Sequence, residues 1–154
     1  KLHAYQAAIT WMGNLGTGTD HYRNYSRDYE IKIAHKKPLA GSADPAFRGD
    51  SSLYNPEELL LSSIASCHLL WYLHLCADNG VIVEAYSDHA TGTMEELSNG
   101  SGYFTEIVLH PIVTVANETM VNIAKELHAR ANKMCFIANS VNFPVRHQVE
   151  IKVK

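Results

Sequence analysis

The sequence feature that most constrains the fold is a long apolar segment that begins at an unusually complete helix-start signal. Asn55 is a favoured N-cap residue, Pro56 suits the first helical position, and Glu58 stands three positions after the cap, as in a capping box. The segment continues to Asn79-Gly80, a pair typical of a left-handed helix stop. The sequence therefore predicts one long helix between the cap and this stop.

This segment is also long enough to span a bilayer, so its flanks and polar content matter. Acidic residues flank it on both sides, and no Lys or Arg anchors either end. Polar side chains interrupt it repeatedly, at Ser62, Ser63, Ser66, His68 and His74. We interpret the segment as the buried central helix of a soluble protein and expect no membrane partner.

Length and charge exclude further classes of protein. A chain of 154 residues suits one domain, residues 1–154, that is large enough to bury a sizeable core. The formal net charge of −3 gives no electrostatic case for binding nucleic acid. Three cysteines are too few, and odd in number, for a secreted disulfide scaffold, and the N-terminal residues lack a signal-peptide pattern. We therefore expect a cytoplasmic protein.

The remaining segments indicate an α+β fold, with antiparallel sheet packed with two central helices. The predicted order is β-β-loop-α-β-β-α-β. Strands are expected within residues 2–12, 24–34, 81–96, 102–115 and 143–153, a long loop at 37–54, and a second helix capped by Asn117.

Two cysteines stand out because each adjoins an apolar helical stripe. Cys67 lies on the first predicted helix, and Cys135 continues the apolar face of the second. Cys76 lies nine residues after Cys67, a rise of about 13.5 Å along a helix. Disulfides need Cα atoms within about 7 Å, so Cys67–Cys135 is the pairing that two helices can bring together. The alternative is that all three are small buried hydrophobic residues.

A reactive cysteine also needs a cationic neighbour, because a free thiol with a pKa of roughly 8.5 is mostly protonated at neutral pH. Arg48 lies in the loop that leads directly into the first helix, and Arg27 lies further upstream. A guanidinium stays charged and can bridge a thiolate and a carboxylate. The alternative for Arg48 is a solvated loop charge.

The segment Asn55-Pro56-Glu57-Glu58-Leu59-Leu60, followed by Cys67, resembles the signature of the OsmC/Ohr family of osmotically inducible and organic-hydroperoxide-resistance proteins. The resemblance extends over nearly the whole chain and implies an OsmC-like fold with an intertwined homodimer. It also implies a thiol-dependent peroxidase that reduces organic hydroperoxides to alcohols and is recycled by an external dithiol, small or lipoyl-bearing, without a cofactor.

The same resemblance implies a role for each of four residues. Cys67 matches the peroxidatic cysteine, which becomes a sulfenic acid, and Cys135 matches the resolving cysteine, which forms a disulfide with it. Glu57 matches the helix-start glutamate and Arg48 the loop arginine. The family usually has Pro after the second cysteine, where this chain has Phe136, which indicates a less characterised OsmC-like branch.

Two other functions are compatible with these residues. The first is a non-catalytic stress protein of the same fold that binds a small ligand. The second is metal binding, because nine histidines accompany the three cysteines. However, His68 and His74 are six residues apart, and no Cys-x-x-Cys or His-x-x-x-His spacing occurs, so we expect no metal.

Overall fold

The structure is a computed structural model that describes residues 1–154. The chain forms two compact units, Lys1–Leu60 and Leu61–Lys154. The expectation of a single domain stays a prediction.

The first unit is a small antiparallel sheet. Its strands are β1 (Ala8–Trp11), β2 (Tyr29–Lys32) and β3 (Leu39–Gly41), in the order β1-β2-β3. β3 and the short 3₁₀ helix η1 (Pro45–Phe47) occupy part of the segment 37–54, which the sequence predicted as loop only. β3 forms by pairing with β2, a tertiary contact that its local composition does not reveal. None of the buried hydrophobic side chains lies in this unit.

The long helix α1 (Pro56–Asp78) confirms the strongest sequence prediction. Its capping box is formed: the Glu58 N–H donates to Asn55 Oδ1 at 2.8 Å, and the Asn55 N–H donates to Glu58 Oε1 at 3.4 Å. Gly80 takes a left-handed φ of 70°, and the Val81 N–H then closes the helix end on the Cys76 carbonyl.

By length and composition, α1 is one helix that could cross a membrane. One face of it nevertheless belongs to the hydrophobic core, through Tyr72, Leu75 and Cys76. Only 28% of its most apolar stretch is buried, so its interpretation as the buried central helix of a soluble protein stays a prediction.

The second unit contains two three-stranded sheets, in the orders β4-β7-β9 and β5-β6-β8. Each of the three strands predicted beyond α1 is divided in two. The strands are β4 (Val83–Asp88), β5 (Thr91–Glu96), β6 (Gly102–Leu109), β7 (Pro111–Val115), β8 (Val145–His147) and β9 (Glu150–Val153).

The breaks between β4 and β5 and between β6 and β7 share one local cause. Asp88 Oδ1 accepts the His110 backbone N–H at 2.7 Å, and Pro111 has no N–H to continue the ladder. The hairpin formed by residues 83–115 therefore changes sheet at this point, so that its base and its tip belong to different sheets.

The α+β fold class is confirmed, but the sheets of this unit are mixed rather than antiparallel. β8 pairs parallel to β6, and β9 pairs parallel to β7, whereas the hairpin pairs are antiparallel. The sequence showed where the last strand lies but not the direction of its neighbours, because non-local pairing leaves no local pattern.

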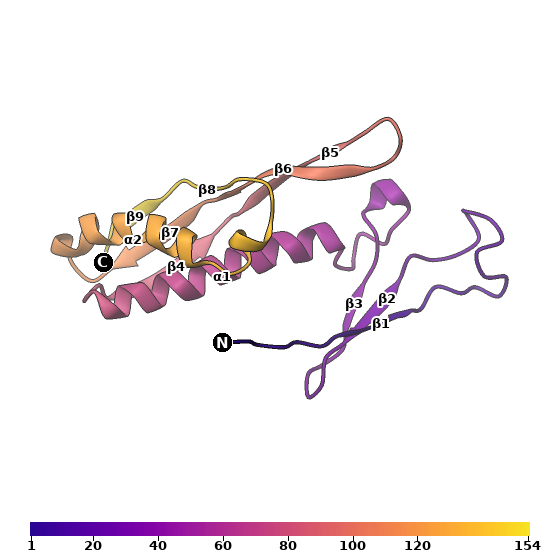
Figure 1. The fold of residues 1–154 in the computed structure, drawn as a ribbon, viewed down its shortest axis with the longest axis horizontal. Coiled ribbons are helices and arrows are strands. Elements are labelled where there is room, and N and C mark those ends of the chain that lie inside the picture. The colour runs from indigo at the N-terminus through magenta and orange to yellow at the C-terminus, as the bar shows by residue number, and fades with distance from the viewer. The chain divides into compact units, whose positions relative to one another are not determined.

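The second helix is α2 (Val121–Met134), preceded by the 3₁₀ turn η2 (Glu118–Met120). Asn117 caps this turn, as predicted, by accepting the Thr119 N–H. The hydrophobic core joins α1 and α2 to β7 (Figure 1). A further 3₁₀ turn, η3 (Ala138–Ser140), follows α2.

Candidate functional site

The structure brings Cys67 and Cys135 together in the second unit. The Cys67 thiol, on α1, neighbours the Cys135 thiol, at the C-terminal end of α2, closely enough to affect its pKa. Both are free thiols, and so is Cys76. Cys76 is instead a neighbour of Tyr72 within the core. The two neighbouring thiols are therefore those of the cysteines that the sequence analysis paired.

The two thiols have different surroundings. Cys67 is partly exposed, whereas Cys135 is 1% exposed. Burial raises the pKa of Cys135 to about 11; the Ala138 N–H, 3.4 Å from its sulfur, acts against this rise, and the neighbouring Cys67 adds to it. Cys135 is thus a protonated thiol at neutral pH, and Cys67 is the thiol that an external molecule can reach.

An apolar surface lies on the same side of α1 as Cys67. Leu70, Trp71 and His74 follow Cys67 at helical spacing and line a shallow hollow of about 250 Å³. The Phe136 ring packs edge-on against Trp71, with the ring centroids 5.6 Å apart, and is 67% exposed. Phe136, which stands where the family resemblance implies a proline, therefore places an exposed aromatic ring directly after Cys135 in the chain.

Glu57 lies in the first unit, where it lines a cavity of about 360 Å³. Most of the lining is aromatic or apolar, and Arg27 supplies its one cationic side chain. The Arg27 guanidinium donates to the carbonyls of Tyr22 and Tyr25, at 2.6 Å each, and lies over both tyrosine rings. Glu57 and Arg27 thus share one cavity.

Arg48 does not line that cavity. It is exposed and ends η1 in a left-handed conformation, with φ 64°, its N–H donating to the Pro45 carbonyl at 3.1 Å. The assignment of Arg48 as the functional arginine stays a prediction. The signal for Arg27 was the run of tyrosines around it, since such rings hold a guanidinium by stacking.

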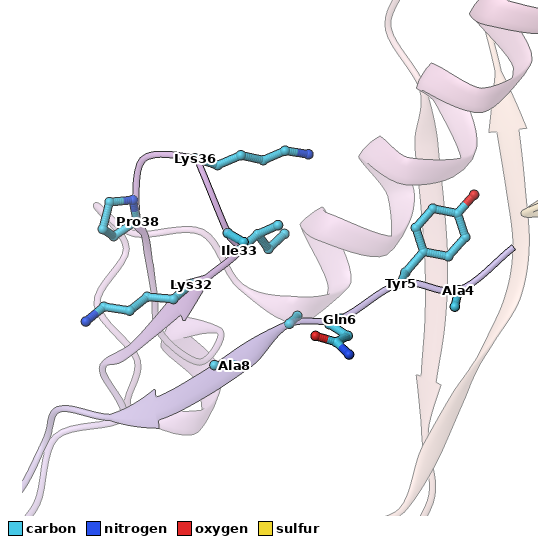
Figure 2. A pocket seen from close by; sticks show the side chains of 10 residues that line it. Ala4, Tyr5, Gln6, Ala8, Lys32, Ile33, Lys36 and Pro38 are labelled. Carbon is cyan, nitrogen blue, oxygen red and sulfur yellow. The ribbon is translucent and has the colours of Figure 1, made fainter.

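A second hollow in the first unit, an open groove of about 1210 Å³, runs along the N-terminal segment (Figure 2). Tyr5 and Gln6 line one part of it, and Lys32 and Lys36 another. No cysteine, histidine or carboxylate lines this groove. In neither unit is a group of three or more His, Cys, Asp or Glu side chains arranged to hold a metal ion.

Comparison with protein families gives one match: the family model described as OsmC-like protein matches residues 49–150. An OsmC-like protein of unknown function from Vibrio cholerae is 28% identical, with a TM-score of 0.85 over 96% of this chain and 99% of that one. No match was found among curated proteins.

More distant structures share the fold. An organic hydroperoxide resistance protein from Elizabethkingia anophelis is 15% identical, with a TM-score of 0.71 over 100% of this chain and 99% of that one. Another from Legionella pneumophila is 18% identical, with a TM-score of 0.69 over 99% of this chain and 100% of that one. At these identities the likeness concerns the fold alone.

Proposed function

Because the chain belongs to the OsmC-like family, which includes hydroperoxide resistance proteins, we propose that it is a thiol-dependent peroxidase that reduces organic hydroperoxides to alcohols. The observation that carries this proposal is that the Cys67 and Cys135 thiols are neighbours, one partly exposed and one buried. Such a pair contains both the attacking and the resolving group of a two-cysteine peroxidase.

In the first step, the Cys67 thiolate attacks the distal oxygen of the hydroperoxide and the O–O bond breaks. The alkoxide leaves and takes up a proton to become the alcohol, and Cys67 becomes a sulfenic acid. In the second step, the Cys135 thiol displaces water from that sulfenic acid and forms the Cys67–Cys135 disulfide. An external dithiol, small or lipoyl-bearing, then reduces the disulfide and is itself oxidised.

Charged and apolar groups have separate roles in this proposal. An arginine, Arg48 by the sequence assignment, stabilises the Cys67 thiolate and the negative charge of the leaving oxygen, and Glu57 orients it. The cavity shared by Glu57 and Arg27 supports Arg27 as the alternative guanidinium. Trp71 and Phe136 supply apolar surface, which favours bulky organic peroxides over hydrogen peroxide.

We further propose a homodimer in the cytoplasm. Leu70 and Leu73 on α1 are 66% and 38% exposed, and Ile9 and Trp11 on β1 are also exposed. Exposed apolar side chains on a long helix and on an edge strand favour burial against a second copy. The three free thiols support a reducing compartment.

A thiol titration before and after one equivalent of cumene hydroperoxide tests the proposed reaction. We expect two thiols per chain to be lost, with peptide mapping that joins Cys67 to Cys135. Cys76→Ser is the matched control and should lose the same two thiols. Retention of all thiols, or Cys76 in the main disulfide, contradicts the mechanism.

One observation favours a second function, the binding of a small ligand without catalysis. The first unit holds an aromatic cavity with one cation, Arg27, and two carboxylates, Asp44 and Glu57, a composition suited to orienting a small molecule. In that case peroxide leaves the thiol count unchanged, so the same titration separates the two functions.

A further inference from the structure

Three histidines are gathered between the elements that carry the thiols. His68 lies on α1 directly after Cys67, His128 lies on α2, and His147 ends β8. His68 and His128 are 1% and 0% exposed, and His68 Nε2 lies 2.9 Å from His128 Nδ1. The His147 ring is 6.0 Å from the His68 ring and 6.1 Å from the His128 ring.

The contact between His68 and His128 is a hydrogen bond between two neutral rings. Burial lowers the pKa of His68 to about 4, with the nearby His147 adding to the effect. Burial likewise lowers the pKa of His128 to about 3, helped by the two other histidines. At pH 7 each ring therefore has one N–H and one lone pair, so one ring donates and the other accepts.

This arrangement leaves polar atoms buried without a partner. His68 Nδ1, His128 Nε2 and His147 Nδ1 have no hydrogen-bond partner, whichever tautomers are present. Unpartnered polar atoms in a protein interior cost free energy, whereas two apolar side chains of similar volume would pack at this place without that cost. Stability alone therefore does not account for the pair.

The pair is one of few polar contacts that join α1 to α2. Tyr72 supplies a neighbouring one, since its hydroxyl donates to the Ala124 carbonyl at 2.9 Å, and its ring stacks on His128 at 3.8 Å. Apolar side chains can pack in more than one register, but a buried hydrogen bond tolerates only a narrow range of lengths and directions. The histidine pair is thus suited to fixing how the two helices lie against each other.

The thiols depend on that same relation between the helices. Cys67 adjoins His68 on α1, and Cys135 follows His128 by seven residues, two helical turns along the same face of α2. A disulfide forms only when the Cα atoms lie within about 4.4–6.8 Å and the sulfurs meet at the right angle. A small shift of one helix along the other would therefore separate the thiols.

We propose that His68 and His128 are positioning residues, whose mutual hydrogen bond holds α1 and α2 in the one arrangement that places Cys67 and Cys135 within disulfide reach. The catalytic use of that arrangement rests on the proposed peroxidase function. The positioning of the two thiols by the two helices does not depend on that function.

The test is the equilibrium of the thiol pair with glutathione, measured in a Cys76→Ser background. In this exchange the protein dithiol and glutathione disulfide give the protein disulfide and two reduced glutathione molecules. The double variant His68→Leu/His128→Leu removes both polar partners while keeping apolar bulk. We expect its equilibrium constant to fall at least tenfold, which corresponds to a reduction potential about 30 mV higher. A value within twofold of the parent overturns the proposal.

Amide variants provide the same test in a protein closer to the parent. Gln at position 68 keeps a polar atom near the Nε2 position, whereas Asn does not, so His68→Gln should retain the equilibrium constant and His68→Asn should lower it. At position 128 the bonding atom is Nδ1, so the order should reverse, with His128→Asn retaining it and His128→Gln lowering it. Equal effects of Asn and Gln at both positions overturn the proposal.

Tyr72→Phe is the matched control, because it removes a different buried hydrogen bond between the same helices. We expect it to lower the unfolding free energy while leaving the glutathione equilibrium within twofold. An equal loss in Tyr72→Phe would assign the effect to general loosening and overturn the specific role. Because no peroxide is used, a protein with the expected equilibrium but no reaction with cumene hydroperoxide would contradict the peroxidase proposal alone.

Discussion

Acidification should destabilise the second unit through its buried histidines, and His68 gives a magnitude. Its pKa is about 4 in the folded chain, against 6.5 when unperturbed. Between these values the unfolded chain binds a proton that the folded chain does not, so stability falls as the pH falls. At about 1.36 kcal/mol for each pH unit, His68 alone contributes a loss of about 3 kcal/mol from pH 6.5 to pH 4. Below pH 4 this contribution stops growing.

The loss of stability that the parent shows beyond that of His68→Gln is the contribution of His68, because His128 destabilises both proteins on acidification. Urea unfolding at a series of pH values measures it, in a Trp11→Phe background where Trp71 is the one remaining tryptophan. His3→Gln, at an exposed position, is the control and should follow the parent. Parallel loss of stability in the parent and in His68→Gln would refute the reasoning.

The functional arginine and the oligomeric state are tested separately. Loss of the arginine that stabilises the Cys67 thiolate should slow iodoacetamide alkylation of Cys67 at pH 7 about ten- to a hundredfold, the equivalent of a charge-assisted hydrogen bond of about 1.5–3 kcal/mol. Arg48→Ala tests the assignment made from the sequence, and Arg27→Ala tests the residue that shares the cavity of Glu57. Rates within twofold of the parent in both variants would exclude these two arginines as stabilisers of the thiolate. Sedimentation at micromolar concentration should show a homodimer, and a monomer there would contradict the proposed dimer.

The parts of the fold that the sequence predicted are those that local chemistry determines. The bounds of α1 follow from residues 55–58 and from Gly80, which act on their immediate neighbours. The strand breaks and β3 were missed, because they depend on partners far along the chain. The bond from Asp88 to His110 illustrates this, since neither residue alone signals a change of sheet.

The candidate site likewise contains residues that the sequence identified and residues that it did not. The family signature identified Cys67 and Cys135, and their thiols are neighbours in the structure. The histidine pair could not be predicted, because His68 and His128 lie 60 residues apart and occupy otherwise apolar helix faces. Arg27 is held by the rings and carbonyls of Tyr22 and Tyr25 in its own segment. Its position in the cavity therefore depends on the conformation of that loop, which residue spacing in the sequence does not reveal.

The absence of buried hydrophobic side chains from the first unit has a consequence for how the chain reaches its folded state. A segment without such side chains gains little free energy by folding alone, whereas residues 61–154 contain the whole core. The carboxyl-terminal unit should therefore acquire protection from proteases first during refolding. The amino-terminal sheet would stay cleavable until another surface covers it, so limited proteolysis during refolding should release fragments that end before Leu61.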